Sequence, residues 1–403
     1  MAYMGKVGAV LAVFLVAGAT GWKGYRYFGT TAMPTCTIEG IEQGETYGHN
    51  VMTRIKGYDV YKVSSLSLEL DGKPIRTVTI GKKVGELTFT LPIDQLTDGE
   101  HSITASVTGA GYHNRKATTT VSFTVDRMPL EIAFIKNGVD AKVYQGKTFH
   151  VQFRANKELF KASAKLFSKE YPCFLESNRA FIYECYIPVE CEEAPESYGL
   201  AIEAVDRAGH KATLESAVKV LPFPFKKQVL NIPADKIKIE NEQHLTEKDL
   251  EDQLEKLATH SPHKKLWQGP FITPIEIKDQ KQITTEYGVI RATQERGLCQ
   301  HKALDMYASP KSVVWAPQEG IVVLKNRFAH SGNTIVIDHG WGVFTLLFHL
   351  DTFAPIELGE TIKKGKPVGT LGKTGYATGY HVHWEMRVGN VAVDPLEWTK
   401  QNF

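Results

Sequence analysis

Short stretches in which apolar and polar residues alternate run through the chain from about residue 30 to residue 220. Leu66, Leu68 and Leu70 alternate with polar residues and end at an Asp-Gly turn. The same pattern recurs at residues 121–125, 149–153 and 200–204. Successive side chains of a strand point to opposite faces, so the pattern predicts half-buried strands. Short strands separated by turn signals are typical of β-sandwiches.

A faint internal repeat divides this region in two. The stretches "GEHSITASVTGAGYHNRKATTTVSFTV" and "ESYGLAIEAVDRAGHKATLESAVKV" share a strand, a turn containing Ala-Gly and a second strand. Their spacing is close to the length of one sandwich domain. We therefore predict two tandem immunoglobulin-like β-sandwiches, residues 29–127 and 128–222, which act as spacers or binding modules.

A proline-rich stretch, "LPFPFKKQVLNIPADK", then interrupts the strand pattern. Thr246 and Asp249 form a predicted capping box, and Leu250, Leu254 and Leu257 fall on one face of the helix that it begins. We predict a connector with a short helix over residues 223–266, packed on a neighbouring domain.

The last part of the chain, residues 267–403, is again rich in strand and turn signals. The stretches "GIVVL", "NTIVIDHG", "WGVFTLLFHL" and "HVHWEMRV" are separated by glycine-rich segments, and no long amphipathic helix is predicted. The connections are short, which favours an antiparallel sheet. The predicted fold class is therefore mainly β: two sandwiches, a helical connector and a C-terminal antiparallel-β domain.

The composition is that of a globular protein. The 403 residues are 42% hydrophobic and carry a formal net charge of +2, which gives no support for nucleic-acid binding. The five cysteines form no CxxC pair, so a thiolate zinc site is not expected. Cys173, Cys185 and Cys191 are close enough in sequence for one disulfide, and the choice among them stays open.

The N-terminus carries an apolar run, "VGAVLAVFLVAGATGW", that follows Lys6 and precedes Lys23 and Arg26. The run is shorter than the roughly 20 residues of a usual spanning helix but long enough for the core of a signal peptide. Two interpretations of residues 1–28 stay open: a signal peptide, with a small-residue cleavage site, or an N-terminal membrane anchor formed by residues 6–22. Either kind of segment would direct export of the rest of the chain, so we expect a periplasmic or cell-envelope location.

Two histidines begin the last strand pattern, in "HVH". His381 and His383 are two residues apart, so on a strand they share a face and their side chains start roughly 6.5 Å apart. Either this face is ordinary wet surface, or a metal ion or carboxylate lies between the two rings.

Three further residues favour the second interpretation. His349 ends another apolar strand, on the face that the alternation assigns to Val343, Thr345 and Leu347. The stretch "QHKALD" supplies His301 and Asp305. Two imidazoles and one carboxylate suit zinc and leave a fourth position open for water.

These motifs resemble the LytM- or lysostaphin-type zinc metallopeptidases, which cut peptide bonds in bacterial peptidoglycan. The resemblance covers roughly residues 270–395 and runs through "ITTEYGVIR", "HKALD", "VVWAPQEGIVV", "NTIVIDHGWGVFTLLFHL", "GETIKKGKPVGTLGKTGYATGYHVHWEMRV" and "VDP", in the family's order. Some members of that family place immunoglobulin-like domains before the peptidase, as predicted here.

The resemblance implies a role for each candidate residue. His301, Asp305 and His383 match the zinc ligands. His349 and His381 match the two catalytic histidines, one a general base and the other a transition-state stabiliser, with the assignment open. The remaining positions match the substrate groove and its rim: Arg291, Thr378 and Gly379. Glu385 is either a residue that orients a ligand or a surface charge.

One departure from the family pattern concerns the backbone. The family usually has glycine where this chain has Ala303, and Lys311 stands at a common turn glycine. A positive φ at Ala303 would cost about a kcal/mol or more and shift the ligands.

The sequence thus predicts a zinc-dependent endopeptidase acting on peptidoglycan peptides, touching the membrane only through its N-terminal segment. The alternative is a non-catalytic peptidoglycan-binding scaffold or activator of other wall hydrolases. A latent enzyme is a further alternative, in which the connector helix covers the groove and deletion of the residues before Trp267 raises activity.

Overall fold

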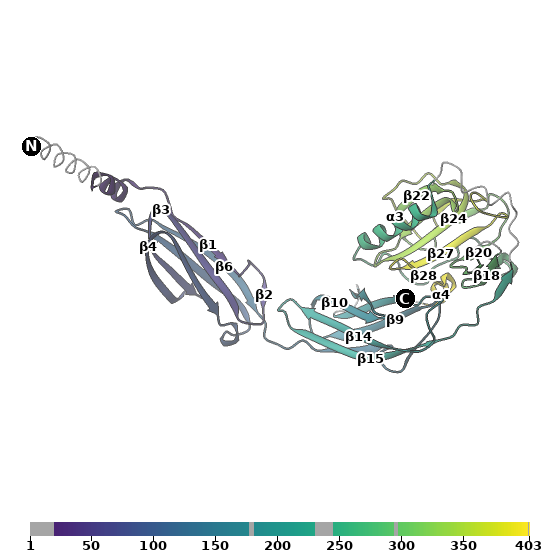
Figure 1. Ribbon diagram of the computed structural model, residues 1–403, viewed down its shortest axis with the longest axis horizontal. Helices are drawn as coiled ribbons and strands as arrows, with labels where there is room; N and C mark the ends of the chain where they lie inside the picture. The colour runs from purple at the N-terminus through teal and green to yellow at the C-terminus, as the bar shows by residue number, and fades with distance from the viewer. Residues whose placement is uncertain (1–19, 177–180, 230–244, 294–296, 402) are drawn as a thin grey trace, which may run out of the picture. The chain divides into compact units, whose positions relative to one another are not determined.

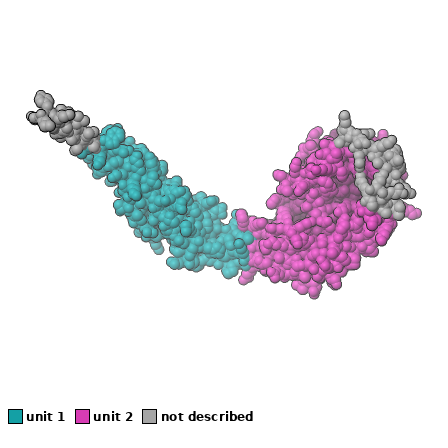
Figure 2. All heavy atoms as spheres, viewed as in Figure 1, with its two compact units in different colours: residues 1–130, 205–211 teal, residues 131–204, 212–403 magenta. Residues whose placement is uncertain are grey.

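The computed structural model describes residues 20–176, 181–229, 245–293, 297–401 and 403, and the fold is mainly β, as predicted (Figure 1). The chain divides into two compact units (Figure 2): unit 1 holds residues 1–130 with 205–211, and unit 2 holds residues 131–204 with 212–403. Most of the predicted N-terminal segment, residues 1–19, lies outside the described residues. Among the residues that are described, no helix is long and apolar enough to span a membrane.

Within the described part of unit 1, six strands form one hydrogen-bonded sheet in the order β1-β3-β5-β6-β2, with β4 on β3. The predicted alternation is observed: Leu66 and Leu68 of β3 are fully buried beside Phe123 of β6. The immunoglobulin-like description of this region remains a prediction. The elements are β1 (Thr35–Glu39), β2 (Thr46–Tyr47), β3 (Val51–Leu70), β4 (Lys73–Leu91), η1 (Ile93–Gln95), β5 (Gly99–Gly109) and β6 (Lys116–Val125).

Two sheets follow over residues 131–176 and 181–221, which belong to unit 2 apart from residues 205–211, and their strand orders are β11-β10-β14-β15-β8 and β12-β13-β9-β7. The chain passes from one sheet to the other between β11 and β12. The strands are β7 (Ile132–Lys136), β8 (Ala141–Tyr144), β9 (Thr148–Ala155), β10 (Leu159–Leu166), β11 (Lys169–Pro172), β12 (Phe174–Leu175), β13 (Ile182–Pro188), β14 (Ser197–Asp206) and β15 (Lys211–Leu221).

The C-terminal part of unit 2 is built on a ten-stranded sheet over the described residues 283–401, with β17-β20-β27-β24-β23-β22-β25 as its main path. Its pairs are antiparallel, as predicted. The elements are β16 (Lys227–Val229), α3 (Glu247–His260), η3 (Gln280–Gln282), β17 (Ile283–Thr285), β18 (Ile290–Thr293), β19 (Gly297–Gln300), β20 (Leu304–Met306), β21 (Val313–Trp315), β22 (Gly320–Phe328), β23 (Gly332–Asp338), β24 (Val343–Phe353), β25 (Thr361–Ile362), β26 (Pro367–Leu371), β27 (Val382–Val388), β28 (Val391–Val393) and α4 (Pro395–Lys400).

The helix α3 begins where its sequence predicts. The Thr246 side chain accepts a hydrogen bond from the Asp249 backbone N–H, and the Asp249 carboxylate accepts one from Thr246 N–H, which completes the capping box. Leu250 and Leu254 are buried, and Leu257 packs beside them. The predicted apolar face of the connector helix is therefore the face that packs on the C-terminal sheet.

The two parts of unit 2 share one hydrophobic core. Tyr186 of β13 is 4% exposed and its ring lies 5.6–6.1 Å from three indoles, centroid to centroid, those of Trp267, Trp341 and Trp398. Large aromatic side chains bury much apolar surface and favour such tilted and edge-on contacts. This aromatic cluster fixes the C-terminal sheet against the strands that precede it.

Candidate metal centre

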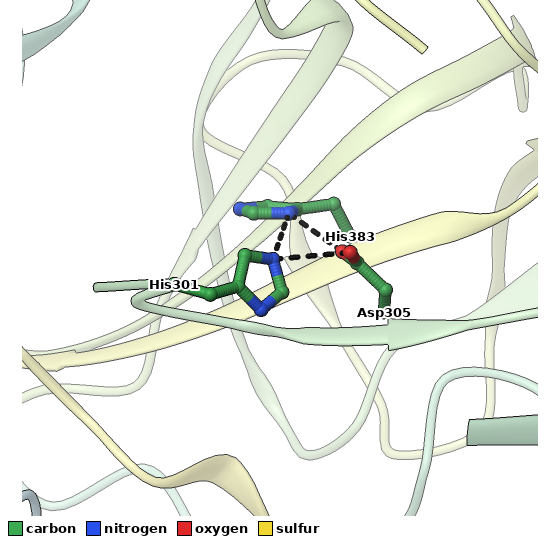
Figure 3. A group of neighbouring side chains, drawn as sticks. All are labelled: His301, Asp305 and His383. Carbon is green, nitrogen blue, oxygen red and sulfur yellow. Dashed lines mark hydrogen bonds and ion pairs between the residues drawn. The ribbon is translucent and has the colours of Figure 1, made fainter. Parts of the chain in front are cut away.

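Three potential metal ligands converge where β20 meets β27 (Figure 3). Asp305 lies directly opposite His383 in the register of the two strands. His301 comes from the segment before β20, and its Nε2 atom lies 3.1 Å from Asp305 Oδ2 and 3.3 Å from His383 Nδ1. The His383 Nδ1 atom lies 2.8 Å from Asp305 Oδ1. Sheet register therefore brings together two residues, Asp305 and His383, that are 78 positions apart in the chain.

Hydrogen bonds on the far side of each ring fix which nitrogen faces the cluster. His301 Nδ1 lies 3.2 Å from the Glu286 carbonyl oxygen, which can only accept, so Nδ1 carries the hydrogen and Nε2 presents its lone pair. His383 Nε2 lies 3.2 Å from Glu385 Oε1, which leaves Nδ1 to face Asp305. Carbonyl and carboxylate partners of this kind commonly orient metal-binding histidines.

The charges around Asp305 also suit a cation. Burial raises the pKa of Asp305, but hydrogen bonds from His301 and His383 outweigh it and hold the pKa well below its usual range. Burial likewise opposes a proton on His383, yet its hydrogen bonds to Asp305 and Glu385 raise its pKa to about 9. A metal ion binding at His383 Nδ1 therefore displaces a proton. The donor set, two imidazole nitrogens and a carboxylate, fits a divalent transition-metal ion.

The side chain of His349 lies at this site, although strand alternation predicts that it points to the other face of the sheet. By alternation, His349 would lie on the same face as Val343, Thr345 and Leu347. In the register of β24 and β27, however, Leu347 lies opposite Trp384, and this pair is on the other face of the sheet from His383. The pairing of β23 with β24 shifts by one residue just before Leu350, and His349 has φ +62°. This bulge turns the His349 ring towards His383, so the predicted face was wrong. A positive φ is strained for a side chain of this kind, and such strain clusters at functional sites.

His349 and His381 have their Nδ1 atoms engaged in the same way. His349 Nδ1 donates to the Thr374 carbonyl oxygen at 2.8 Å, and His381 Nδ1 donates to the Gly379 carbonyl oxygen at 3.0 Å. The two ring centroids are 4.8 Å apart, and His349 lies 5.9 Å from the ring of the ligand His383. Burial lowers the pKa of both side chains, so both rings are neutral near pH 7 with Nε2 able to accept a proton.

The structure places the three predicted groove residues differently from one another. Arg291 Nη2 donates to Asp305 Oδ2 at 2.8 Å and to Thr285 Oγ1 at 3.1 Å, so it holds a candidate metal ligand in place. Thr378 and Gly379 are exposed beside His381, and a Cβ atom added to Gly379 would meet open space. Their contact with substrate remains a prediction.

The backbone departures are accommodated. Ala303 lies outside the left-handed region and is fully buried, so its methyl group packs without the predicted strain. Lys311 does adopt a positive φ, +63°, as the turn requires.

Two charged residues behind the site, Arg387 and Glu251, were missed by the sequence analysis, whereas Glu385 was named there with two alternative roles. Glu385 is 7% exposed, so it is not a surface charge, and it accepts a hydrogen bond from Arg387 Nε at 2.8 Å. Arg387 in turn pairs with Glu251 of α3 through both terminal nitrogens, at 2.7 and 2.8 Å. Side-chain alternation along β27 places Arg387 on the same face as His383 and Glu385, so Arg387 could have been found from the sequence. No sequence feature indicates Glu251.

Comparison with known proteins bears on this arrangement. Residues 299–395 match the family model described as peptidase family M23. The chain carries a peptidase M23 domain at its C-terminus. The five residues that the structure brings together all lie inside the match: His301, Asp305, His349, His381 and His383.

Relatives resemble this chain over the M23 domain. The DD-carboxypeptidase/endopeptidase Mpg of Neisseria meningitidis serogroup B is 36% identical over 97 residues, 24% of this chain and 22% of that protein. The peptidoglycan DD-endopeptidase ShyC of Vibrio cholerae serotype O1 is 33% identical over 95 residues, 24% of this chain and 22% of that protein. The matches thus span about a fifth of these relatives' length. The catalytic domain of lysostaphin from Staphylococcus simulans aligns over 36% of this chain and 97% of its own, with 21% identity and a TM-score of 0.24.

Proposed function

We propose that this chain is a zinc-dependent endopeptidase that hydrolyses peptide bonds in bacterial peptidoglycan. The observation that carries the proposal is the convergence of His301, Asp305 and His383 beside two neutral, backbone-anchored histidines. The M23 match and the relatives, which include peptidoglycan DD-endopeptidases, support the reaction and the substrate class.

The proposed mechanism divides the work among five side chains. His301, Asp305 and His383 would hold the zinc ion, which would supply Lewis acidity to polarise a peptide carbonyl and acidify water. Of His349 and His381, one accepts a proton at Nε2 from the attacking water and returns it to the leaving amine, and the other stabilises the developing negative charge. Their Nδ1 hydrogen bonds to carbonyl oxygens keep both rings in the required orientation.

The location of the enzyme follows from the same proposal. Peptidoglycan lies outside the cytoplasm, and the predicted N-terminal signal peptide or anchor would deliver the domain there. We propose that the chain works in the periplasm or cell envelope, with the β-rich residues 29–222 positioning the M23 domain on the wall.

Digestion of purified peptidoglycan by the full chain tests the proposal. We expect released fragments with new amino termini, no release after treatment with a chelator, and recovery when zinc is added back. Mass analysis of the fragments identifies the bond that is cut. A protein that retains no stoichiometric zinc and leaves peptidoglycan intact would instead favour the scaffold alternative.

A further inference from the structure

The connector helix α3 packs on the sheet face that carries the metal centre (Figure 1). In the register of β24 and β27, Phe348 lies opposite His383 and Leu346 lies opposite Glu385. Residues directly opposite in an antiparallel pair share a face. Leu250 and Leu254 of α3 are buried among apolar side chains of this face, which include Leu324, Phe328, Val336, Phe344, Leu346 and Phe348. The helix therefore covers the apolar continuation of the metal-binding face.

A continuous chain of charged hydrogen bonds runs from α3 to a metal ligand. Glu251 accepts two hydrogen bonds from the Arg387 guanidinium, at 2.7 and 2.8 Å. Arg387 Nε donates to Glu385 Oε2 at 2.8 Å, and Glu385 Oε1 lies 3.2 Å from His383 Nε2. The planar guanidinium holds both carboxylates in fixed directions, which a lysine would not do.

Burial makes this chain sensitive to the loss of any member. Arg387 is 8% exposed and Glu385 is 7% exposed, so neither charge is well solvated. A buried charge that loses its partner is strongly unfavourable and moves towards the nearest remaining counter-charge. Without Glu251, Glu385 is the carboxylate that stays hydrogen-bonded to Arg387 among the described residues, with the Asn390 amide oxygen at 3.0 Å and the Glu247 carboxyl nearby, and Glu385 would then be drawn from His383.

We propose that Glu251 is a positioning residue for the metal centre, which orients His383 through Arg387 and Glu385. The inference rests on the proposed function, because it assumes that His383 binds the metal. It also assigns α3 to the scaffold of the active site. We therefore expect deletion of the residues before Trp267 to weaken metal binding, in contrast to the latent-enzyme alternative.

Zinc affinity of the full chain, measured by competition with a chromogenic chelator, tests the proposal. Glu251→Gln removes the charge at nearly constant volume and should weaken zinc binding about 10-fold, the lower end of the range for residues that orient metal ligands, because Glu251 acts through two intervening side chains. Glu251→Asp should recover most of that loss. Glu255→Gln, an exposed position one turn along the same helix, is the matched control and should change the affinity less than about twofold.

A double-mutant cycle separates positioning from mere helix packing. If Glu251 acts through Glu385, Glu251→Gln should have little further effect in a Glu385→Gln background, because the link is already broken. Additive losses, or unchanged affinity in Glu251→Gln alone, would overturn the proposal. A wild-type chain that binds no zinc would contradict the proposed function itself, which keeps the two failures distinguishable.

A second and independent observation concerns two thiols in the first part of unit 2. Cys173 lies between β11 and β12, and Cys185 lies in β13. The register pairs Phe174 with Glu184 and Leu175 with Tyr183, so Cys173, the residue just before β12, falls opposite Cys185 of β13. This hairpin also carries Phe174, whose ring stacks 4.9 Å from that of Trp341 of the C-terminal sheet.

We infer that Cys173 and Cys185 form a disulfide when a disulfide oxidant is present. The two thiols lose two protons and two electrons to form one S–S bond, and the S–S bond of a small-molecule disulfide, such as oxidised glutathione, is reduced to two thiols. The cross-link would close the hairpin that holds Phe174 and Tyr186 in the shared core of unit 2. This selects one pair from the three cysteines that the sequence left open.

The full chain incubated with oxidised glutathione, then alkylated and digested, tests this inference. We expect a cross-linked peptide joining Cys173 to Cys185, two fewer reactive thiols, and a melting temperature on the order of 5–10 °C higher than in reductant. Cys173→Ser should abolish all three changes, and Cys36→Ser should leave them intact. A glutathione adduct on Cys173 alone, a different pair, or five reactive thiols would overturn the inference.

Discussion

Each unit of the molecule buries an aspartate among cationic partners, and the partners decide what the aspartate can do. In unit 1, Asp59 accepts two hydrogen bonds from Arg115, at 2.5 and 3.2 Å, and two from the backbone N–H groups of Tyr61 and Lys62. All four donors carry permanent hydrogens. The carboxylate is therefore saturated, and its role is structural.

Asp305 in unit 2 differs because two of its partners are imidazoles. His301 already turns a lone pair towards Asp305, and His383 can give up the hydrogen that faces it, whereas an arginine or an amide cannot. Removal of the His383 proton leaves two lone pairs and a carboxylate directed at one point. A buried carboxylate thus indicates a metal site only when its neighbours can become acceptors, and the following predictions test that distinction.

The largest expected effect follows from removing a ligand. His383→Ala should lower zinc affinity at least 100-fold and abolish peptidoglycan cleavage, because it deletes one of three donors. Zinc content after dialysis and fragment release are the measurements. Asp59→Ala in unit 1 is the control and should keep the zinc; a loss of zinc there would break the comparison between the two aspartates.

Removal of a catalytic histidine should separate metal binding from chemistry. His381→Ala should retain zinc and lower kcat about 10²–10⁴-fold, the range for loss of a positioned acid–base group. Zinc content and the rate of fragment release check it, with His101→Ala in unit 1 as the matched histidine control. Full activity in His381→Ala would remove this residue from the mechanism.

The sequence predicted those residues whose placement depends on strand periodicity and register. Alternation placed His381 and His383 on one face of a strand, and the resemblance to the LytM-type family implied the role of Asp305. His349 did not follow the alternation, because a one-residue bulge with a positive φ reverses the side-chain direction, and no residue type at that position demands it.

Contacts between segments far apart in the sequence were harder to predict. The capping box of α3 is local, and it was predicted at the right residues. The pairing of Glu251 with Arg387 joins residues 136 positions apart, and an exposed glutamate on a helix has the same sequence signature whether it is solvated or paired. The same holds for Tyr186, whose indole partners come from three separate segments.

A stability experiment tests the structural role of Asp59 in unit 1. Asp59→Ala should destabilise that unit by about 3–5 kcal/mol, because it leaves the buried Arg115 guanidinium without its counter-ion. Urea unfolding monitored by a probe in unit 1 measures the change. A loss below about 1 kcal/mol would show that Arg115 finds sufficient compensation in the carbonyl oxygens of Ala32 and Ala110, to which it also donates.

The smallest effect is a difference in acid sensitivity between two histidines outside the metal centre. In unit 2, burial lowers the pKa of His339 to about 4, and its two nitrogens contact the Glu319 carbonyl oxygen and the Thr345 hydroxyl. In unit 1, burial opposes a proton on His101, but its hydrogen bond to Asp71 outweighs this and raises its pKa.

The two histidines should therefore respond to acid with opposite sign. Below pH 6.5, His339 binds a proton in the unfolded chain but not in the folded chain. The contribution of His339 to the free energy of unfolding is therefore full above that pH and falls by about 2 kcal/mol between pH 7.5 and 5. Protonated His101 instead favours the folded state. Urea unfolding in chelator at both pH values should show that His339→Asn loses about 2 kcal/mol less than the wild type on acidification; equal losses would mean that the folded chain protonates His339 as readily as the unfolded chain.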